Sequence, residues 1–207
     1  MCIRDSTVTC PNPACRAEMP LVRQWWLANT GSRKIALKPV VDREAKRIEF
    51  EVVNLGREQR NDFDPNEGTS SRGHAECLVC GQIAHVETIR DEGAIGRMSE
   101  MPLAVIFEQT NVGKGYRLFA TQDAALFREA KTLLASTNDK APDEPLPPIG
   151  TLGFRVQRYG LTRWGDLFNT RQLLALLTFS GRVRAAYETM VTEGMETGRA
   201  KAVATYL

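Results

Sequence analysis

The sequence predicts a mixed α+β fold, and three observations support that prediction. Apolar and charged residues alternate from 47 to 53, which is typical of a half-buried β-strand. From 173 to 190 apolar residues recur every three or four positions, which is typical of an amphipathic helix. Four of the five cysteines form two close pairs, one on either side of the predicted strand. We therefore expect a β module with an inserted β-hairpin, followed by a small α/β segment and C-terminal helices.

The two cysteine pairs predict a metal site. Their sequences are Cys10-Pro-Asn-Pro-Ala-Cys15 and Cys77-Leu-Val-Cys80. Structural zinc binds four thiolates tetrahedrally, and each short pair would form one turn, or knuckle, with both sulfurs pointing inward. Two prolines inside the first knuckle and Gly81 after the second suit such turns. The module is therefore expected to be zinc-ribbon-like, with these metal ligands: Cys10, Cys15, Cys77 and Cys80.

Buried or disulfide-bonded cysteine is the alternative interpretation of both pairs. The chain has mixed charge and no secretory leader, which argues against stable disulfides and predicts a cytoplasmic protein. Its apolar content of 43% and charged content of 25% are ordinary for a globular protein. No apolar run approaches the roughly 18 residues that a membrane span needs, so we expect no membrane association.

Both ends of the chain look unusual. Residues 1–6, Met1-Cys-Ile-Arg-Asp-Ser6, resemble the translation of a sequencing-adapter scar, so we expect a non-native leader, Cys2 included. The last residues, 202–207, stop inside an apolar helical pattern without a cap, glycine or proline. We expect the chain to be a fragment of a larger protein.

Residues 7–135 are predicted to form the zinc-ribbon-containing α+β module. Trp25 and Trp26 would face opposite sides of a short strand, and burial is favoured over stacking on nucleic-acid bases because large aromatics dominate small cores. Strands are expected over 34–40 and 47–53, which places a hairpin between the two halves of the metal site. The polar stretch 54–73 is rich in Gly, Asn and Ser and predicts an exposed loop.

A second strand pair and several helices are predicted further along. Alternation predicts strands over 102–109 and 115–120, and a helix follows over 121–135. Residues 136–150 form a Pro-rich linker, because the prolines prevent a helix or a central strand. Residues 151–207 form a helical segment in which Asn169 and Gln172 match a capping box. A final helix is expected from 194 or 196 onward.

Catalytic patterns are missing from the sequence. There is no locally supported Ser/His/Asp or Cys/His set, no Gly-x-Gly-x-x-Gly and no phosphate-binding loop. His74 and His85 flank the second cysteine pair, and with four cysteines available we expect them to be bystanders or outer-shell groups. A zinc ion held by four cysteines has no open position to activate water. The residues alone therefore predict a structural metal and no catalytic site.

Three segments resemble a known family. They are Cys10-Pro-Asn-Pro-Ala-Cys15-Arg-Ala-Glu-Met-Pro-Leu21 with Trp25-Trp26-Leu27, Gly150-Thr-Leu-Gly-Phe-Arg-Val-Gln157, and Tyr159-Gly-Leu-Thr-Arg-Trp-Gly-Asp-Leu-Phe-Asn-Thr-Arg-Gln-Leu-Leu174. Together they resemble the central part of large prokaryotic proteins, the adenine-specific DNA methylases that contain a zinc ribbon and an N-terminal domain of unknown function. The resemblance covers essentially everything after Ser6.

The resemblance implies a parent protein that transfers a methyl group from S-adenosylmethionine to DNA. In that family the zinc-ribbon region lies between a glycine-rich cofactor-binding motif and an Asp-Pro-Pro-Tyr catalytic motif. Neither occurs here, since 143–148 has the wrong order and no aromatic follows its prolines. We therefore expect an inactive, structural insert whose remaining methyltransferase domain is missing from the chain. The alternative is a non-catalytic zinc-binding module that mediates protein contacts.

The charge distribution offers DNA-contact candidates. The net charge is only +2, but 151–207 holds eight basic residues against four acidic ones. Such a segment suits the phosphates of DNA, while a solvated helix face explains the same charges. The phosphate-contact candidates are Arg155, Arg158, Arg163, Arg171, Arg182 and Arg184.

Overall fold

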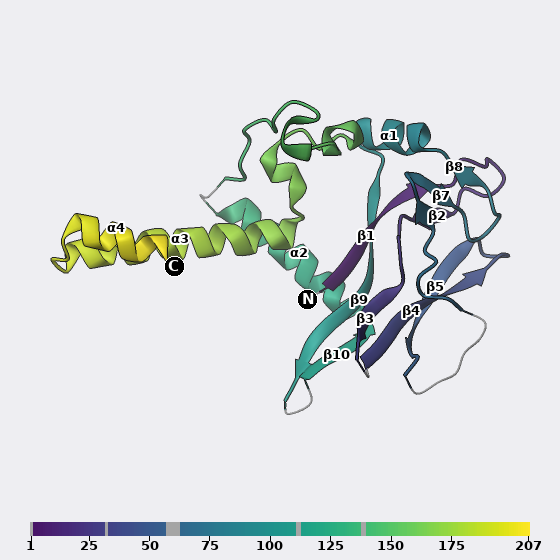
Figure 1. Cartoon of the computed structure of the whole chain (residues 1–207), viewed down its shortest axis with the longest axis horizontal. Coiled ribbons are helices and arrows are strands. Elements are labelled where there is room, and N and C mark those ends of the chain that lie inside the picture. The colour runs from purple at the N-terminus through teal and green to yellow at the C-terminus, as the bar shows by residue number, and fades with distance from the viewer. Residues whose placement is uncertain (1, 32, 57–62, 111–112, 138–139) are drawn as a thin grey trace. The chain divides into compact units, whose positions relative to one another are not determined.

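The computed structural model describes residues 2–31, 33–56, 63–110, 113–137 and 140–207 (Figure 1). The chain divides into two compact units, Met1–Ala120 with Val156–Gly160, and Thr121–Arg155 with Leu161–Leu207. In its described part the protein has antiparallel sheets and four α-helices, which confirms the predicted mixed α+β class. Within the same residues, no helix is both long and apolar enough to cross a membrane.

A four-stranded antiparallel sheet has the order β10-β9-β1-β2. Its strands are β1 (Cys2–Thr9), β2 (Glu18–Pro20), β9 (Ser99–Gln109) and β10 (Gly113–Leu118). The predicted pairing of the last two is confirmed, although part of their turn, 111–112, lies outside the described residues. Residues 2–6, part of the expected non-native leader, belong to β1, whose backbone pairing with β9 runs from Cys2 to Thr7.

A second sheet contains the inserted hairpin. Strands β3 (Trp26–Thr30), β4 (Arg33–Asp42) and β5 (Arg47–Asn54) pair in that order, and the β4–β5 register closes at Asp42 opposite Arg47. Half-buried and exposed residues alternate along most of β5, as the sequence predicts. Phe50 from this strand packs its ring 6.0 Å from that of Trp25. Trp25 is 3% exposed, which confirms that it is a core residue.

Residues 63–71 are not the exposed loop that their composition predicts. Their backbone runs beside 22–25 and hydrogen-bonds it, and the Thr69 hydroxyl accepts the Val22 N–H at 3.0 Å. The segment leads into a small sheet of β6 (Ser70–Ser71), β7 (His74–Glu76) and β8 (Ile83–Ala84). Helix α1 (Val86–Ala94) follows, an element that the sequence does not predict.

Two hydrophobic clusters form the core of this first unit. One gathers three of the cysteines with apolar residues of β1, β2, β7, β8 and α1, such as Met19 and Ile89. The other joins Trp25 and Leu37 to Leu103 of β9, and so links the inserted hairpin to the four-stranded sheet. The short 3₁₀ helix η2 (Val156–Tyr159) packs against α1 and completes the unit.

The second unit is helical. It contains α2 (Thr121–Ser136), the 3₁₀ helices η1 (Thr151–Gly153) and η3 (Trp164–Leu167), α3 (Thr170–Thr192) and α4 (Thr197–Thr205). The capping box is confirmed: the Asn169 side chain accepts from two backbone N–H groups of α3, and Gln172 accepts from the Asn169 N–H at 3.0 Å. Helix α3 packs against both α2 and α4. The linker is partly packed, since Leu146 is buried and Pro145 bridges Arg163.

Candidate metal centre

Each cysteine pair lies at the tip of a β-hairpin. Strands β1 and β2 end their pairing at Thr9 opposite Glu18, and the Cys10 N–H then donates to the Ala17 carbonyl at 2.8 Å. Strands β7 and β8 end at Glu76 opposite Ile83, and the Cys77 N–H donates to the Gln82 carbonyl at 2.9 Å. The first cysteine of each pair therefore lies one residue beyond the last strand pair of its hairpin, and a backbone hydrogen bond across the hairpin holds it there.

Both knuckles close through a residue with positive φ. In the second knuckle this residue is Gly81 (φ 76°), whose N–H donates to the Cys77 carbonyl at 2.8 Å. In the first it is Arg16 (φ 55°), whose N–H donates to the Asn12 carbonyl at 3.0 Å. Glycine adopts this conformation without strain, whereas an arginine there costs about 1–2 kcal/mol. The first knuckle therefore completes the same turn with local backbone strain at Arg16.

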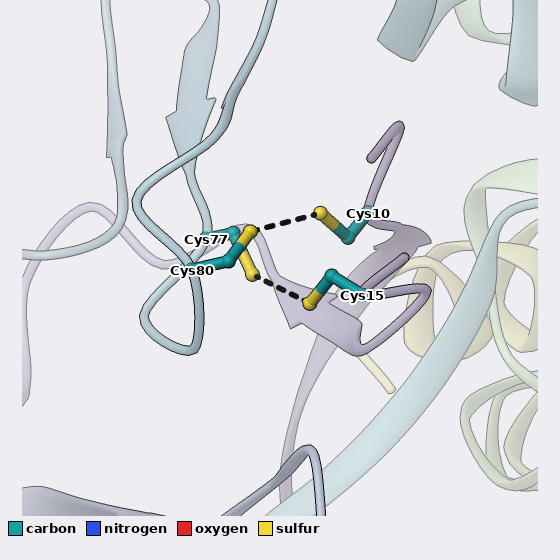
Figure 2. A group of neighbouring side chains, drawn as sticks. All are labelled: Cys10, Cys15, Cys77 and Cys80. Carbon is teal, nitrogen blue, oxygen red and sulfur yellow. Dashed lines mark hydrogen bonds between the residues drawn. The ribbon is translucent and has the colours of Figure 1, made fainter. Parts of the chain in front are cut away.

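The four sulfurs converge, as the cysteine spacing predicts (Figure 2). All lie within 4.8 Å of one another. Cys10 Sγ is 3.6 Å from Cys80 Sγ, and Cys15 Sγ is 3.9 Å from Cys77 Sγ. A zinc ion with four Zn–S bonds of about 2.3 Å would place its sulfurs about 3.8 Å apart. The group could hold a metal ion of that size, and all four cysteines are free thiols.

The protein environment differs among these thiols. Burial raises the pKa of Cys10 to about 12 and also raises the pKa of Cys77. The Gln82 backbone N–H lowers the pKa of the exposed Cys80 to about 7. Backbone N–H groups also bond to the other two sulfurs, from Asn12 to Cys10 and from Val79 and Cys80 to Cys77. Such hydrogen bonds favour thiolates, which are the form of cysteine that binds metal.

Two residues outside the four-thiol group connect the first knuckle to its surroundings. The Asn12 side-chain amide donates to Cys80 Sγ at 3.7 Å, and its oxygen accepts the Ala14 N–H at 3.0 Å. Lys46, at the turn of the inserted hairpin, donates its ammonium to the Ala14 carbonyl at 2.7 Å. The sequence does not predict these contacts of Asn12 and Lys46. The position of Asn12 between two prolines of the knuckle is a signal that could have indicated its role.

The histidines stand apart from this group. Their rings pack edge to face, with centroids 5.3 Å apart, and both residues are exposed. Among the described residues, the converging set of potential metal ligands is made of the four cysteines and includes neither His74 nor His85.

The six candidate DNA-contact arginines do not form one group. Arg158 belongs to the first unit and the other five to the second. Three of those five have intramolecular partners: Arg163 lies 3.8 Å from an Asp143 carboxylate oxygen, Arg171 stacks 4.9 Å above the Phe127 ring, and Arg184 donates to Ser180 at 3.3 Å. All six, including Arg155 and Arg182, are exposed.

No family model, curated protein or solved structure matches this chain. The fold and the site define an α+β protein with a convergent four-thiol group that could hold a metal ion.

Proposed function

We propose that the first unit is a zinc-ribbon module in which one zinc ion, bound by Cys10, Cys15, Cys77 and Cys80, fastens two β-hairpins together. The observation that carries this proposal is the sulfur geometry: two Sγ–Sγ distances, 3.6 and 3.9 Å, lie on either side of the tetrahedral value of about 3.8 Å. The equivalent position of each pair at a hairpin tip supports it further.

The role of this zinc is structural. Four thiolates fill its coordination sphere, so no position is left for water or substrate. The two knuckles are separated by residues 16–76, which include the whole inserted hairpin. A bound ion joins these distant segments, and its binding free energy becomes folding free energy.

We further propose that the chain is the central insert of an S-adenosylmethionine-dependent, adenine-specific DNA methyltransferase of a prokaryote. The support is the resemblance of 10–27 and 150–174 to that family, together with the proposed ribbon. The insert lacks both the cofactor-binding and the catalytic motif, so it is inactive alone and would help position DNA within the parent. Arg182 and Arg155 are the best contact candidates in the second unit, because Arg163, Arg171 and Arg184 have internal partners.

A protein-interaction module is the second candidate, and one observation favours it. Large apolar side chains of the helical unit are exposed, with Phe179 of α3 at 72% and Tyr206 after α4 at 93%. These side chains are available for contact with a protein partner, which would remove apolar surface from water.

X-ray absorption at the zinc edge tests the metal proposal. We expect four sulfur neighbours at about 2.3 Å and about one zinc per chain. Nitrogen neighbours, or a protein that purifies without zinc and with disulfides, would refute the ribbon.

Gel-shift titration separates the DNA and protein-contact candidates. Phosphate contacts predict weak duplex binding that fades steeply with salt and weakens further in the Arg155→Gln/Arg182→Gln variant. Equal behaviour of the variant and the original protein would favour the interaction module.

Calorimetry tests whether the chain binds the cofactor of the parent protein. We expect no binding of S-adenosylmethionine to the chain.

A further inference from the structure

A second candidate site lies away from the thiols, where residues 66–73 face Arg23. An open cavity of about 740 Å³ occupies this place. Its polar lining includes Arg23, Arg72, Ser70, Ser71, Asn66 and Glu67. The cavity belongs entirely to the first unit, and its walls come from two segments that are more than 40 residues apart in sequence.

One wall of the cavity is fixed by backbone hydrogen bonds. The Gly68 N–H donates to the Arg23 carbonyl at 3.2 Å, and the Ser70 N–H donates to the Val22 carbonyl at 2.8 Å. A Cβ added to Gly68 would lie 2.1 Å from the Val22 carbonyl oxygen, so only glycine permits this approach. The two segments are therefore locked side by side before any ligand binds.

The adjacent tryptophans hold the same wall. Trp25 Nε1 donates to the Glu67 carbonyl at 2.8 Å, and Trp26 Nε1 donates to Asn66 Oδ1 at 2.9 Å. The Asn66 amide nitrogen donates in turn to Asp64 at 2.8 Å, so Asn66 acts as part of the wall. Preorganisation of this kind lowers the entropy lost when a ligand binds.

Arg72 has a backbone conformation that arginine rarely adopts. It has φ 52° and precedes Gly73 (φ 86°) in the two-residue turn between Ser71 and its partner His74. Asparagine, aspartate or glycine is usual at the first position of such turns. Gly73 itself lies against α1, since an added Cβ would be 2.9 Å from Val86 Cγ2. An arginine is thus held at the tip of an anchored turn beside the cavity.

The cavity lining contains two arginine side chains. Within the described part of the chain, neither Arg23 nor Arg72 makes an ion pair, and both are exposed. Among the lining residues the two arginines outnumber the acidic residue, Glu67. Arginine binds phosphate through paired hydrogen bonds, and serine hydroxyls can donate to the remaining phosphate oxygens, so the residue types of the lining suit a phosphate group.

We infer that this cavity binds a phosphate group, with Arg23 and Arg72 as its charged donors and Ser70 and Ser71 as neutral ones. The group could come from a free phosphate compound or from the phosphodiester backbone of a nucleic acid. The inference is independent of the zinc and methyltransferase proposals, because its residues include no metal ligand and none of the C-terminal arginines.

Nuclear magnetic resonance titration of the whole ¹⁵N-labelled chain tests the site. The probes are inorganic phosphate and, separately, a short single-stranded oligodeoxynucleotide, at an ionic strength held constant with chloride. We expect saturable shifts of the Trp25 and Trp26 indole signals and of the 66–73 amides. Binding of the oligonucleotide alone would assign the site to a nucleic-acid strand, and binding of inorganic phosphate would assign it to the phosphate group itself.

Matched variants complete the test. The change Arg23→Gln with Arg72→Gln should weaken binding by about tenfold or more, since charge-assisted hydrogen bonds are lost. The control, Arg43→Gln with Arg47→Gln, removes the same charge from the β4–β5 turn and should bind as the original does. Absence of saturable shifts, shifts located elsewhere, or equal loss in both variants would overturn the inference. If the first variant unfolds, the residues whose signals shift in the titration of the unaltered chain still test the inference.

Discussion

Asn12 in the first knuckle donates its side-chain amide to the sulfur of Cys80 in the second, across 3.7 Å. This contact joins the two halves of the thiol group through a residue that is not itself a ligand. Its geometry depends on the Asn12 oxygen, which is held by the Ala14 N–H at 3.0 Å. Outer residues of this kind orient metal ligands and tune their affinity.

Replacing Asn12 with alanine should therefore weaken zinc binding without removing a ligand. We expect a loss of about tenfold or more in affinity, which is usual for residues that orient metal ligands. Competition with a chromogenic chelator measures it. Asn29→Ala, on the exposed part of β3, is the matched control and should leave the affinity unchanged. Equal affinities for Asn12→Ala and the original protein would show that the contact is unimportant.

Loss of a buried ligand should have a larger effect on folding. Cys77→Ser should release the zinc and lower the free energy of unfolding by several kcal/mol, because metal binding is coupled to folding. Denaturant titration with and without a chelator checks this. Cys2→Ser is the control, and we expect its zinc content to match that of the original chain. A Cys77→Ser protein as stable as the original would argue against a structural metal.

The thiols of the metal-free protein should react unequally with iodoacetamide. Because the pKa of Cys80 is lowered to about 7, its thiolate should predominate above that pH, so alkylation should rise as pH increases through neutrality. Cys10, with its pKa raised to about 12, should stay a thiol and react slowly over the same range. Tandem mass spectrometry of the labelled peptides separates the two. Faster labelling of Cys10 would contradict the assigned environments.

The stability of helix α4 should depend on pH through its N-cap residue, Glu196. The Glu196 carboxylate accepts the Gly198 and Arg199 N–H groups at 2.8 Å each, and these bonds lower its pKa from the ordinary value of a glutamate. A lowered folded-state pKa means that the cap stabilises the helix above the unfolded value and is lost as pH falls through the folded one. The amide shift of Gly198 should follow this titration. In Glu196→Gln the acid-dependent step should disappear.

The sequence predicts the elements whose signals are local. The β4–β5 hairpin follows from alternation, and Asn169 caps α3 because its side chain reaches backbone groups two and three residues ahead. Helix α1 lacks such signals: its N-cap, His85, makes no side-chain cap bond, and Gly93 lies in its last turn. That glycine permits close packing, since an added Cβ would be 2.7 Å from the Tyr159 carbonyl oxygen. Tertiary contact therefore stabilises α1 where propensity does not.

The candidate metal centre likewise combines features with a local sequence signal and features that depend on contacts between distant residues. Cysteine spacing predicts all four thiols of the convergent group, because each knuckle is a local turn. The contact from Asn12 to Cys80 depends on how two distant hairpins meet, so spacing cannot reveal it. Composition predicts an exposed loop over 54–73, but Asn66, Glu67 and Thr69 of that segment bond to Trp26, Trp25 and Val22. These partners lie 40 or more residues earlier in the sequence, so composition cannot reveal them.

The position of β1 inside its sheet has a consequence for the growing chain. Its partner on one side, β2, is close in sequence, but its partner on the other, β9, begins only at Ser99. While a ribosome makes the intervening residues, one edge of β1 has no strand beside it, and such edges readily pair with other molecules. The hairpins form early from neighbouring residues, whereas the sheet closes late. Until β9 has been made, that edge of β1 is therefore open to pairing with other chains.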